Sequence, residues 1–373
     1  MIRPTVARVD LDAVRSNLRA ISAFLASSPH TTPPGIIAVV KANAYGHGAV
    51  EVARALEEAG AAMLACADIE EGVVLRTGGV RIPIVVFGAL GVSDLGGVFQ
   101  HDLTPTISTP SAARALQAVA AAHSTILTCH MKIDTGMNRL GFRHDNLART
   151  LPEVAASPNL FLDAICTHFA TADEPESPAF NAQRERFDAA CATAAALGIT
   201  PRLRHAANSA ALLRDERVWL DMVRPGLLLY GVVPPPFAST LPLRPALSLH
   251  SRIVHVKGIR PGEGTGYGLE RVVDRPSTIA VVPAGYADGL DRRLAGRGYM
   301  LVRGRRVPIV GSVCMDMAMI DVTGTDVAPG DEVVIIGEQG NESIDVREIA
   351  ASIGTIPYEL LCRVGARIER VYE

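Results

Sequence analysis

The sequence predicts an α/β protein in which an N-terminal (β/α)8 barrel of the TIM type is followed by a mostly-β domain. Short apolar runs rich in β-branched residues alternate with alanine-rich helical stretches through the first part of the chain. A closed barrel is the commonest way to bury about eight parallel strands of this kind. After the proline-rich stretch 233–237 the pattern changes to short alternating strands separated by Gly and Asp turns. With 373 residues, the chain is long enough for two hydrophobic cores.

The first elements are an N-terminal strand and an amphipathic helix that begins after Asp10, a residue type that caps helices. The helix is indicated by apolar residues at spacings of three and four, at Leu11, Val14, Leu18, Ile21 and Leu25. The run Gly35–Val40 is apolar throughout, as in a strand buried on both faces of a parallel sheet. Further strands are expected at 63–66, 82–87, 104–108, 126–133, 162–167, 202–205 and near Met222, and helices at 112–122 and 187–197.

In the second domain, alternating β-rich runs predict strands at 251–257, 278–282, 300–302 and 332–336. The glycines at 262, 264, 266 and 268 superficially resemble a dinucleotide-binding loop. They lack the strand, turn and helix that such a loop requires, so we do not expect a Rossmann site here.

Composition favours a role with a small molecule. The net charge is −3, from 36 basic and 39 acidic residues, which gives no electrostatic reason to expect nucleic acid or a membrane as partner. The six cysteines contain no Cys-x-x-Cys pair, so we expect buried free thiols and no metal site. Neither a secretion signal nor an apolar stretch of membrane-spanning length is evident, which predicts a cytoplasmic protein.

Candidate functional residues follow the predicted barrel strands, because the active sites of such barrels lie at the C-terminal ends of the strands. Five polar clusters occupy these positions: 41–48, 132–141, 167–173, 205–209 and 221–226. Lys41 ends an apolar strand, where partial desolvation would lower its pKa and favour imine formation with an aldehyde cofactor. A single lysine at a strand end more often extends to solvent, so Lys41 alone would not carry this interpretation.

These clusters, in this order and with these intervals, resemble bacterial alanine racemases, and the resemblance extends from Arg3 to Tyr372. It implies a fold-type III enzyme that binds pyridoxal 5'-phosphate and interconverts L- and D-alanine, supplying D-alanine for peptidoglycan. It also implies a homodimer with shared active sites. The expected domains are the barrel, 11–240, and a β domain of 1–10 plus 241–373.

The resemblance assigns the two bases of the racemisation. Lys41 would form the aldimine with the cofactor and serve the D-alanine face, and Tyr267 from the other subunit would serve the L-alanine face. Racemisation by this route needs one acid–base group on each face of a planar carbanion.

The remaining site residues also follow from the resemblance. Arg139 would hold the cofactor oxygen or the substrate carboxylate, His168 would lie against the cofactor ring, and Arg224 would face the pyridine nitrogen. A permanently charged arginine there disfavours protonation of that nitrogen and weakens the electron sink. Lys132 matches a lysine that is carbamylated in many members. The phosphate would be bound by Tyr45, Ser209, Gly226, Leu227 and Tyr358, the substrate by Arg139, Tyr286, Met315 and Asp316, and the access channel would be lined by Asp173, Arg292 and Tyr358.

Simpler interpretations exist for several of these residues. His168 could be structural, Arg224 could pair with Asp221, and Ser209 could cap a helix. Relative to the family, the chain has Ser312 where arginine is usual, Gly266 where serine is usual and Glu369 where proline is common. The departures at Ser312 and Gly266 predict that the electrostatics of the access channel differ from those of the family, and Glu369 is expected to affect only local details near the C-terminus.

Three alternative functions share parts of this pattern. A related decarboxylase is disfavoured because its substrate segment and triple glycine are missing. A racemase of broader specificity, acting on serine or several amino acids, remains open. So does a non-enzymatic protein of pyridoxal phosphate homeostasis, which would need Lys41 but no base on the opposite face.

Overall fold

The computed structural model describes residues 3–28, 32–90, 95–269 and 271–373. The chain divides into two compact units, which are described separately. The barrel unit comprises Val14–Ala44 and Ala49–Leu243, and the β unit comprises Met1–Ala13, Tyr45–Gly48 and Arg244–Glu373. Residues 1 and 2 of the expected first segment lie outside the described residues.

The barrel unit contains a closed ring of eight parallel strands in the part of the chain that the structure describes. Strand order around the ring is β5-β4-β3-β2-β10-β9-β8-β6, and pairing of β5 with β6 closes it. This confirms the predicted (β/α)8 fold. The strands are β2 (Gly35–Val39), β3 (Met63–Cys66), β4 (Ile84–Val86), β5 (Thr104–Ile107), β6 (Leu127–Asp134), β8 (Leu160–Cys166), β9 (Leu203–Asn208) and β10 (Met222–Arg224).

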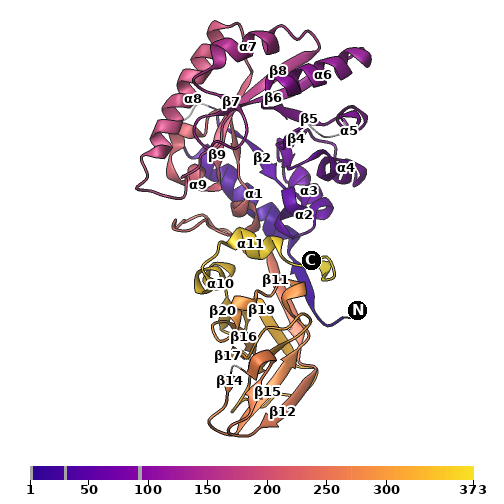
Figure 1. The fold of residues 1–373 in the computed structure, drawn as a ribbon, viewed down its shortest axis with the longest axis vertical. Coiled ribbons are helices and arrows are strands. Elements are labelled where there is room, and N and C mark those ends of the chain that lie inside the picture. The colour runs from indigo at the N-terminus through magenta and orange to yellow at the C-terminus, as the bar shows by residue number, and fades with distance from the viewer. Residues whose placement is uncertain (1–2, 29–31, 91–94, 270) are drawn as a thin grey trace. The chain divides into compact units, whose positions relative to one another are not determined.

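Helices surround these strands (Figure 1). Their starts are set by side chains that bind free backbone amides: Asp68 caps α4, Thr109 caps α6 just before Pro110, and Asn208 caps α9. The helices of this unit are α3 (Ala49–Glu58), α4 (Ile69–Thr77), α5 (Gly96–Gln100), α6 (Pro110–Ala122), α7 (Leu147–Ala155), α8 (Ala179–Ala196) and α9 (Ser209–Arg214), with short turns η1 (Glu216–Val218) and η2 (Leu227–Tyr230) and the two-residue strand β7 (Phe142–Arg143).

The first helix, α1 (Leu11–Ala26), begins as predicted. Asp10 Oδ1 accepts a hydrogen bond from the Ala13 amide at 2.7 Å. The expected apolar face is buried at Leu18, Ile21 and Leu25.

The β unit is built on a ten-stranded sheet with strand order β12-β15-β18-β17-β16-β19-β11-β1-β21, and β20 pairs with β19. Its strands are β1 (Val6–Val9), β11 (Leu247–Arg252), β12 (His255–Ile259), β15 (Ser277–Val282), β16 (Tyr299–Val302), β17 (Arg305–Val310), β18 (Ala318–Asp321), β19 (Glu332–Gln339), β20 (Glu342–Ile344) and β21 (Glu369–Tyr372). A separate two-stranded ribbon consists of β13 (Gly264–Thr265) and β14 (Arg271–Val272). The short helices are η3 (Tyr267–Leu269), η4 (Tyr286–Asp288), η5 (Arg292–Leu294), α10 (Val346–Ile353) and α11 (Pro357–Cys362).

Two expectations are corrected. The run 251–257 is not one strand: β11 ends at Arg252, and β12 begins at His255 and pairs with β15 instead. Not all cysteines are buried, because Cys362 is exposed and Cys191 and Cys314 are half-buried, whereas Cys66, Cys129 and Cys166 are buried.

Candidate active site

Lys41 lies directly after β2, at the C-terminal end of the strand. The four residues that follow it, Ala42 to Tyr45, all have φ between 50° and 54°. Non-glycine residues pay roughly 1–2 kcal/mol each for this left-handed conformation, so the turn must be held by its surroundings. Two hydrogen bonds within the barrel unit hold the turn. The Ala42 amide donates to Glu71 Oε1 at 2.6 Å, and Asn43 Oδ1 accepts from the Ala49 amide at 2.8 Å. Such strain is common beside ligand sites.

Arg224, the last residue of β10, is buried, and both of its terminal nitrogens make hydrogen bonds. Its guanidinium donates to His205 Nδ1 at 2.8 Å and to His168 Nδ1 at 3.2 Å. It also donates to the carbonyl oxygens of Thr167 and Ala206, at 2.8 and 2.9 Å. Asp221 binds Arg204 instead, which argues against a simple ion pair between Asp221 and Arg224. The arginine is thereby fixed in one orientation.

Arg224 also sets the tautomers of two buried histidines: His205, which begins the predicted polar cluster 205–209, and His130, which lies outside the predicted clusters. Because arginine can only donate, His205 Nδ1 must accept, and a neutral His205 then carries its proton on Nε2. That proton is donated to His130 Nδ1 at 3.0 Å, which leaves the His130 proton on Nε2. Burial and the charge of Arg224 lower the pKa of His130 to about 4 and that of His205 well below its ordinary value, so both are neutral at pH 7.

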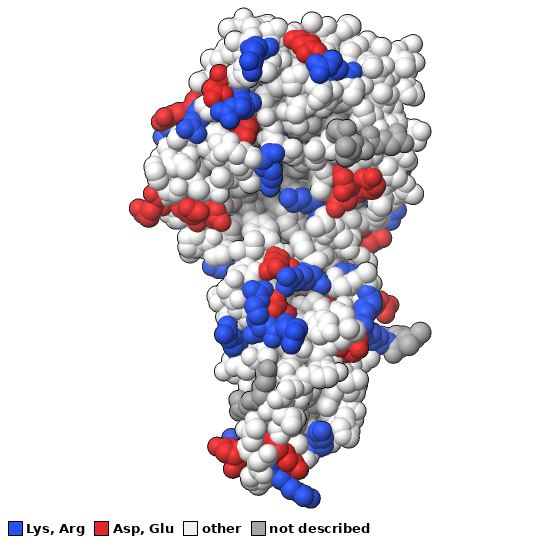
Figure 2. All heavy atoms as spheres, in the orientation of Figure 1, with Lys and Arg blue, Asp and Glu red and all other residues white. Residues whose placement is uncertain are grey.

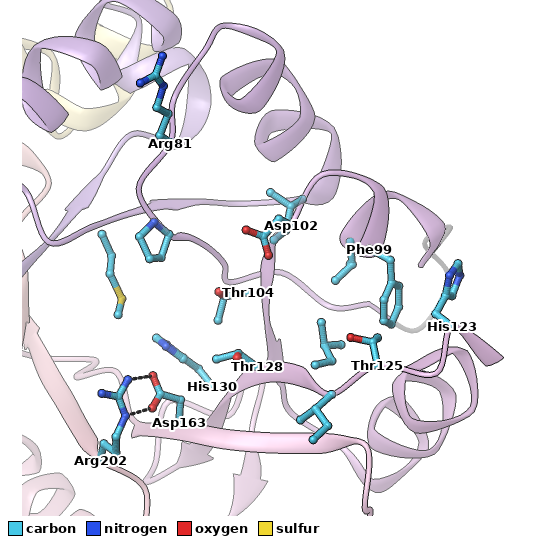
Figure 3. Close-up of a pocket in the computed structure, with 16 residues that line it drawn as sticks. Arg81, Phe99, Asp102, Thr104, His123, Thr125, Thr128, His130, Asp163 and Arg202 are labelled. Carbon is cyan, nitrogen blue, oxygen red and sulfur yellow. Dashed lines mark hydrogen bonds and ion pairs between the residues drawn. The ribbon is translucent and has the colours of Figure 1, made fainter. Parts of the chain in front are cut away.

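The histidine chain ends at a cavity of about 550 Å³ (Figure 3). Within the described residues, no protein atom accepts the His130 Nε2 proton. Lining residues include Asp102, Thr104, Thr128 and the ion-paired Asp163 and Arg202. Several of them lie at or just before the starts of barrel strands, so this cavity is at the barrel end opposite Lys41.

Positive side chains converge on His168 at the Lys41 end of the barrel. Burial lowers the pKa of His168 well below its ordinary value, and the charges of Arg224, Lys132, Arg139 and Lys41 lower it further. The pKa of Lys132 is lowered mainly by burial, with Arg139 and Arg224 contributing in the same direction. The structure therefore brings five predicted site residues of the barrel unit together. Such a cationic cluster suits an anionic ligand.

Ser209 does not cap α9, because Asn208 does. Instead, its buried hydroxyl oxygen accepts the amide of Gly226 at 2.9 Å and that of Leu228 at 3.4 Å. The Ser209 hydroxyl thus joins the start of α9 to η2, which begins at Leu227. Hydroxyl and amide donors at the start of a helical turn form a typical phosphate-binding arrangement.

Apart from Asp173, the other predicted site residues lie in the β unit. Tyr45 and Tyr358 contact each other, with ring centroids 5.8 Å apart. The segments that carry Tyr286 and Met315 lie side by side. The Tyr286 amide donates to the Cys314 carbonyl oxygen at 3.0 Å, and the Ala287 amide donates to the Met315 carbonyl oxygen at 3.1 Å. Asp316 binds Arg367 at 2.8 Å.

Tyr267 lies at the tip of the β13–β14 ribbon with 76% of its surface exposed. Arg292 of η5 is exposed in the same unit, and Asp173 is exposed in the barrel unit. The bases predicted for the two faces therefore belong to different units, each presenting its own part of the expected site.

Family models match both units. The model for the alanine racemase N-terminal domain covers residues 9–234, and that for the C-terminal domain covers residues 246–372. The chain belongs to the alanine racemase family. It is 41% identical to the alanine racemase of Halothermothrix orenii and 42% identical to that of Symbiobacterium thermophilum, in each case over all of this chain and 97% of the relative.

Solved structures of alanine racemases agree with this family membership. The enzyme of Streptomyces lavendulae matches with a TM-score of 0.94 at 36% identity, over 100% of this chain and 98% of the other. The enzyme of Bacillus anthracis, solved with L-Ala-P bound, matches with a TM-score of 0.91 at 37% identity, over 100% and 96%. These matches and the closed ring confirm the fold predicted for a member of this family.

Proposed function

We propose that the protein is a pyridoxal 5'-phosphate-dependent alanine racemase that interconverts L- and D-alanine. The observation that carries the proposal is the positive environment of His168, at the C-terminal ends of the barrel strands: Arg224 donates to it at 3.2 Å, and the charges of Arg224, Lys132, Arg139 and Lys41 lower its pKa. Relatives named alanine racemase that align over the whole chain support it.

The residues present fit this cofactor. Pyridoxal phosphate carries an anionic phosphate and an ionisable ring oxygen, and both suit a cationic barrel mouth with hydroxyl and amide donors. Ser209 and the amides around Gly226 and Leu227, with Tyr45 and Tyr358, would hold the phosphate, and Arg139 would hold the ring oxygen. Lys41 would hold the cofactor covalently, and the bound cofactor would supply an electron sink that acidifies the α-proton of the amino acid.

Arg224 would face the pyridine nitrogen, and its surroundings support that role. Its two histidine partners are neutral acceptors and its other partners are carbonyl oxygens, so no carboxylate neutralises its charge through these hydrogen bonds. A fixed cation opposes a proton on the facing nitrogen. Arg224 would therefore weaken the electron sink and limit side reactions, while His168 packs against the ring.

Two residues would move the proton. Lys41 would take or return it on the D-alanine face and the Tyr267 hydroxyl on the L-alanine face. Arg139, Met315, Asp316 and Tyr286 would orient the substrate, and Asp173, Arg292 and Tyr358 would line its access channel. The exposure of Tyr267 on the β unit is consistent with its use in another subunit's site.

We further propose a homodimer with shared active sites, a barrel domain of 11–240 and a β domain of 1–10 plus 241–373. The product would be D-alanine for peptidoglycan, made in the cytoplasm. Within the described residues, no helix is long and apolar enough to cross a bilayer. On the face drawn in Figure 2, basic and acidic side chains are interspersed, and no large area carries one sign of charge.

The test uses L-alanine in deuterated water and follows α-proton exchange together with the D-enantiomer. Wild type should show both, and Tyr267→Phe should retain the absorbance of bound cofactor while racemisation falls by roughly 10²–10⁴-fold, because the base for one face is lost. Wild-type turnover in Tyr267→Phe would contradict the two-base assignment. Exchange and racemisation both absent from the cofactor-loaded wild type would favour a homeostasis protein, and equal rates with serine would show broader specificity.

A further inference from the structure

We propose that Ser312 positions Tyr267 for proton transfer, through a clamp that it forms with Gly266 beneath the β13–β14 ribbon. The proposal rests on the proposed function, because it assumes that the Tyr267 hydroxyl acts on substrate. Its structural part stands on contacts within the β unit alone.

Tyr267 needs such a support because its own ribbon is short. β13 and β14 contain two residues each and pair only with each other in the described part of the chain. An isolated two-stranded hairpin is marginally stable at best in water. The turn that carries the tyrosine contains three further residues with positive φ, Gly266, Gly268 and Leu269. Without outside contacts, the tyrosine at the ribbon tip would sample many positions.

Ser312 makes a hydrogen bond directly to Tyr267. Its hydroxyl donates to the backbone carbonyl oxygen of Tyr267 at 2.7 Å. Ser312 is only 6% exposed, so water competes little for this hydrogen bond. The bond holds the peptide of Tyr267 and leaves its ring free, as expected of a residue that acts by positioning.

Gly266 completes the clamp from the ribbon side. It has a φ of +72°, and a Cβ added there would lie 3.0 Å from the Ser312 amide nitrogen and 2.8 Å from Met319 Cε. Met319 packs in turn against a buried cluster of Ile259, Val273, Ile279 and Val310. Because glycine has no side chain, the ribbon can pack closely against that core at position 266. This packing brings the Tyr267 carbonyl oxygen to the Ser312 hydroxyl.

Both positions also differ from the pattern that the resemblance implies, which has arginine at position 312 and serine at position 266. In the structure the two positions are neighbours, since a side chain at position 266 would meet the backbone of Ser312. We infer that they are coupled: a small residue at 312 approaches the ribbon, and a glycine at 266 makes room for it. An arginine could not donate from the same place, since its guanidinium lies several bonds further from the backbone than the serine hydroxyl.

Ser312→Ala and Gly266→Ala disturb the clamp from opposite sides and should give the same result. Hydrogen exchange at the amides of the 264–269 segment should become faster, and kcat should fall by about fivefold or more, as expected for losing one positioning hydrogen bond. KM should stay within about twofold, because a base acts in the transition state and contributes little to ground-state binding. The holoenzyme is used, and absorbance of bound cofactor should not change.

Ser277→Ala is the matched control. Ser277 lies in the same unit, is also 6% exposed, and donates to the Arg275 carbonyl at 3.1 Å. Loss of this hydrogen bond in Ser277→Ala should reduce the free energy of unfolding about as much as Ser312→Ala does. It should leave kcat and hydrogen exchange at the 264–269 amides unchanged.

Unchanged exchange at 264–269 in both clamp variants would overturn the clamp. Faster exchange with wild-type kcat would overturn the positioning role and count against Tyr267 as a base, whereas a lower kcat shared by Ser277→Ala would show a general loss of stability instead.

Discussion

At the residue scale, lysine is rare in this chain, and each lysine has a distinct environment. The sequence contains three, Lys41, Lys132 and Lys257, although its basic residues number 36. Lys41 lies two residues after the end of β2 and Lys132 is half-buried within β6, whereas Lys257 is exposed on β12. Covalent chemistry at lysine can therefore be assigned by single substitutions.

Lys132 should react with carbon dioxide to form a carbamate. Only the neutral amine reacts, and burial beside Arg139 and Arg224 lowers the pKa of Lys132 and so raises the neutral fraction. The carbamate would then be stabilised by the same arginines. With labelled bicarbonate, carbon NMR of the protein should show a carbamate signal that disappears in Lys132→Ala and persists in the matched control Lys257→Ala. A signal that survives in Lys132→Ala would contradict the assignment.

At the element scale, three barrel strands determine the state of the site. β10 ends at Arg224, its neighbour β9 carries His205, and β6, beyond β8 in the ring, carries His130. The three side chains form one hydrogen-bonded chain. Each histidine is held neutral by burial and by the arginine charge. The chain connects the proposed cofactor site with the opposite end of the barrel.

This arrangement predicts acid sensitivity. The folded pKa of His130 is about 4, below the ordinary value of 6.5, so the folded state binds fewer protons than the unfolded state at intermediate pH. Stability is fully present above pH 6.5 and should decrease as the pH falls towards 4, by up to about 1.4 kcal/mol per pH unit for each such histidine. His130→Gln keeps an acceptor for His205 and removes one titrating group, so its urea midpoint should depend less on pH.

His255→Gln is the control for that experiment, because His255 is exposed on β12. Its urea midpoints between pH 7 and 5 should follow those of wild type. Equal pH dependence in wild type and His130→Gln would show that His130 is not held neutral by the fold.

At the scale of the whole molecule, the β unit exposes large apolar side chains, some of which belong to predicted site residues or to their neighbours in the sequence. Met315 is 53% exposed and Met317 46%, and Tyr267 and Tyr286 are also exposed. Exposed apolar side chains of this size are frequent in protein interfaces. They support the proposed homodimer.

Met317→Asp should weaken that dimer, because a charge would be buried without a partner at the interface. In sedimentation velocity at micromolar concentration, the variant should shift towards monomer and lose racemase activity while keeping bound cofactor. Ile126→Asp is the control, since Ile126 is an exposed apolar residue of the barrel unit that lines the cavity at the barrel end opposite Lys41, and it should remain dimeric. A Met317→Asp protein as dimeric as wild type would place the interface elsewhere.

Much of the architecture could be predicted because burial leaves a direct trace in sequence. A strand covered on both faces must be apolar throughout, so β2 and β3 can be recognised from sequence. The polar clusters that follow β2 and four later strand-like runs indicate the barrel's C-terminal end. The division of 251–257 into two strands was missed, since both pieces share the same alternation and only the pairing of β12 with β15 separates them.

The sequence by itself determined the barrel, the β-rich second part and the strand ends where Lys41 and Arg224 lie, because these depend on local patterns of apolar and polar residues. Only the tertiary structure decided the left-handed turn after Lys41, the tautomers of His130 and His205, and the hydrogen bond from Ser312 to Tyr267. Each of these depends on atoms that folding brings together from distant positions in the chain, and no local pattern encodes such contacts.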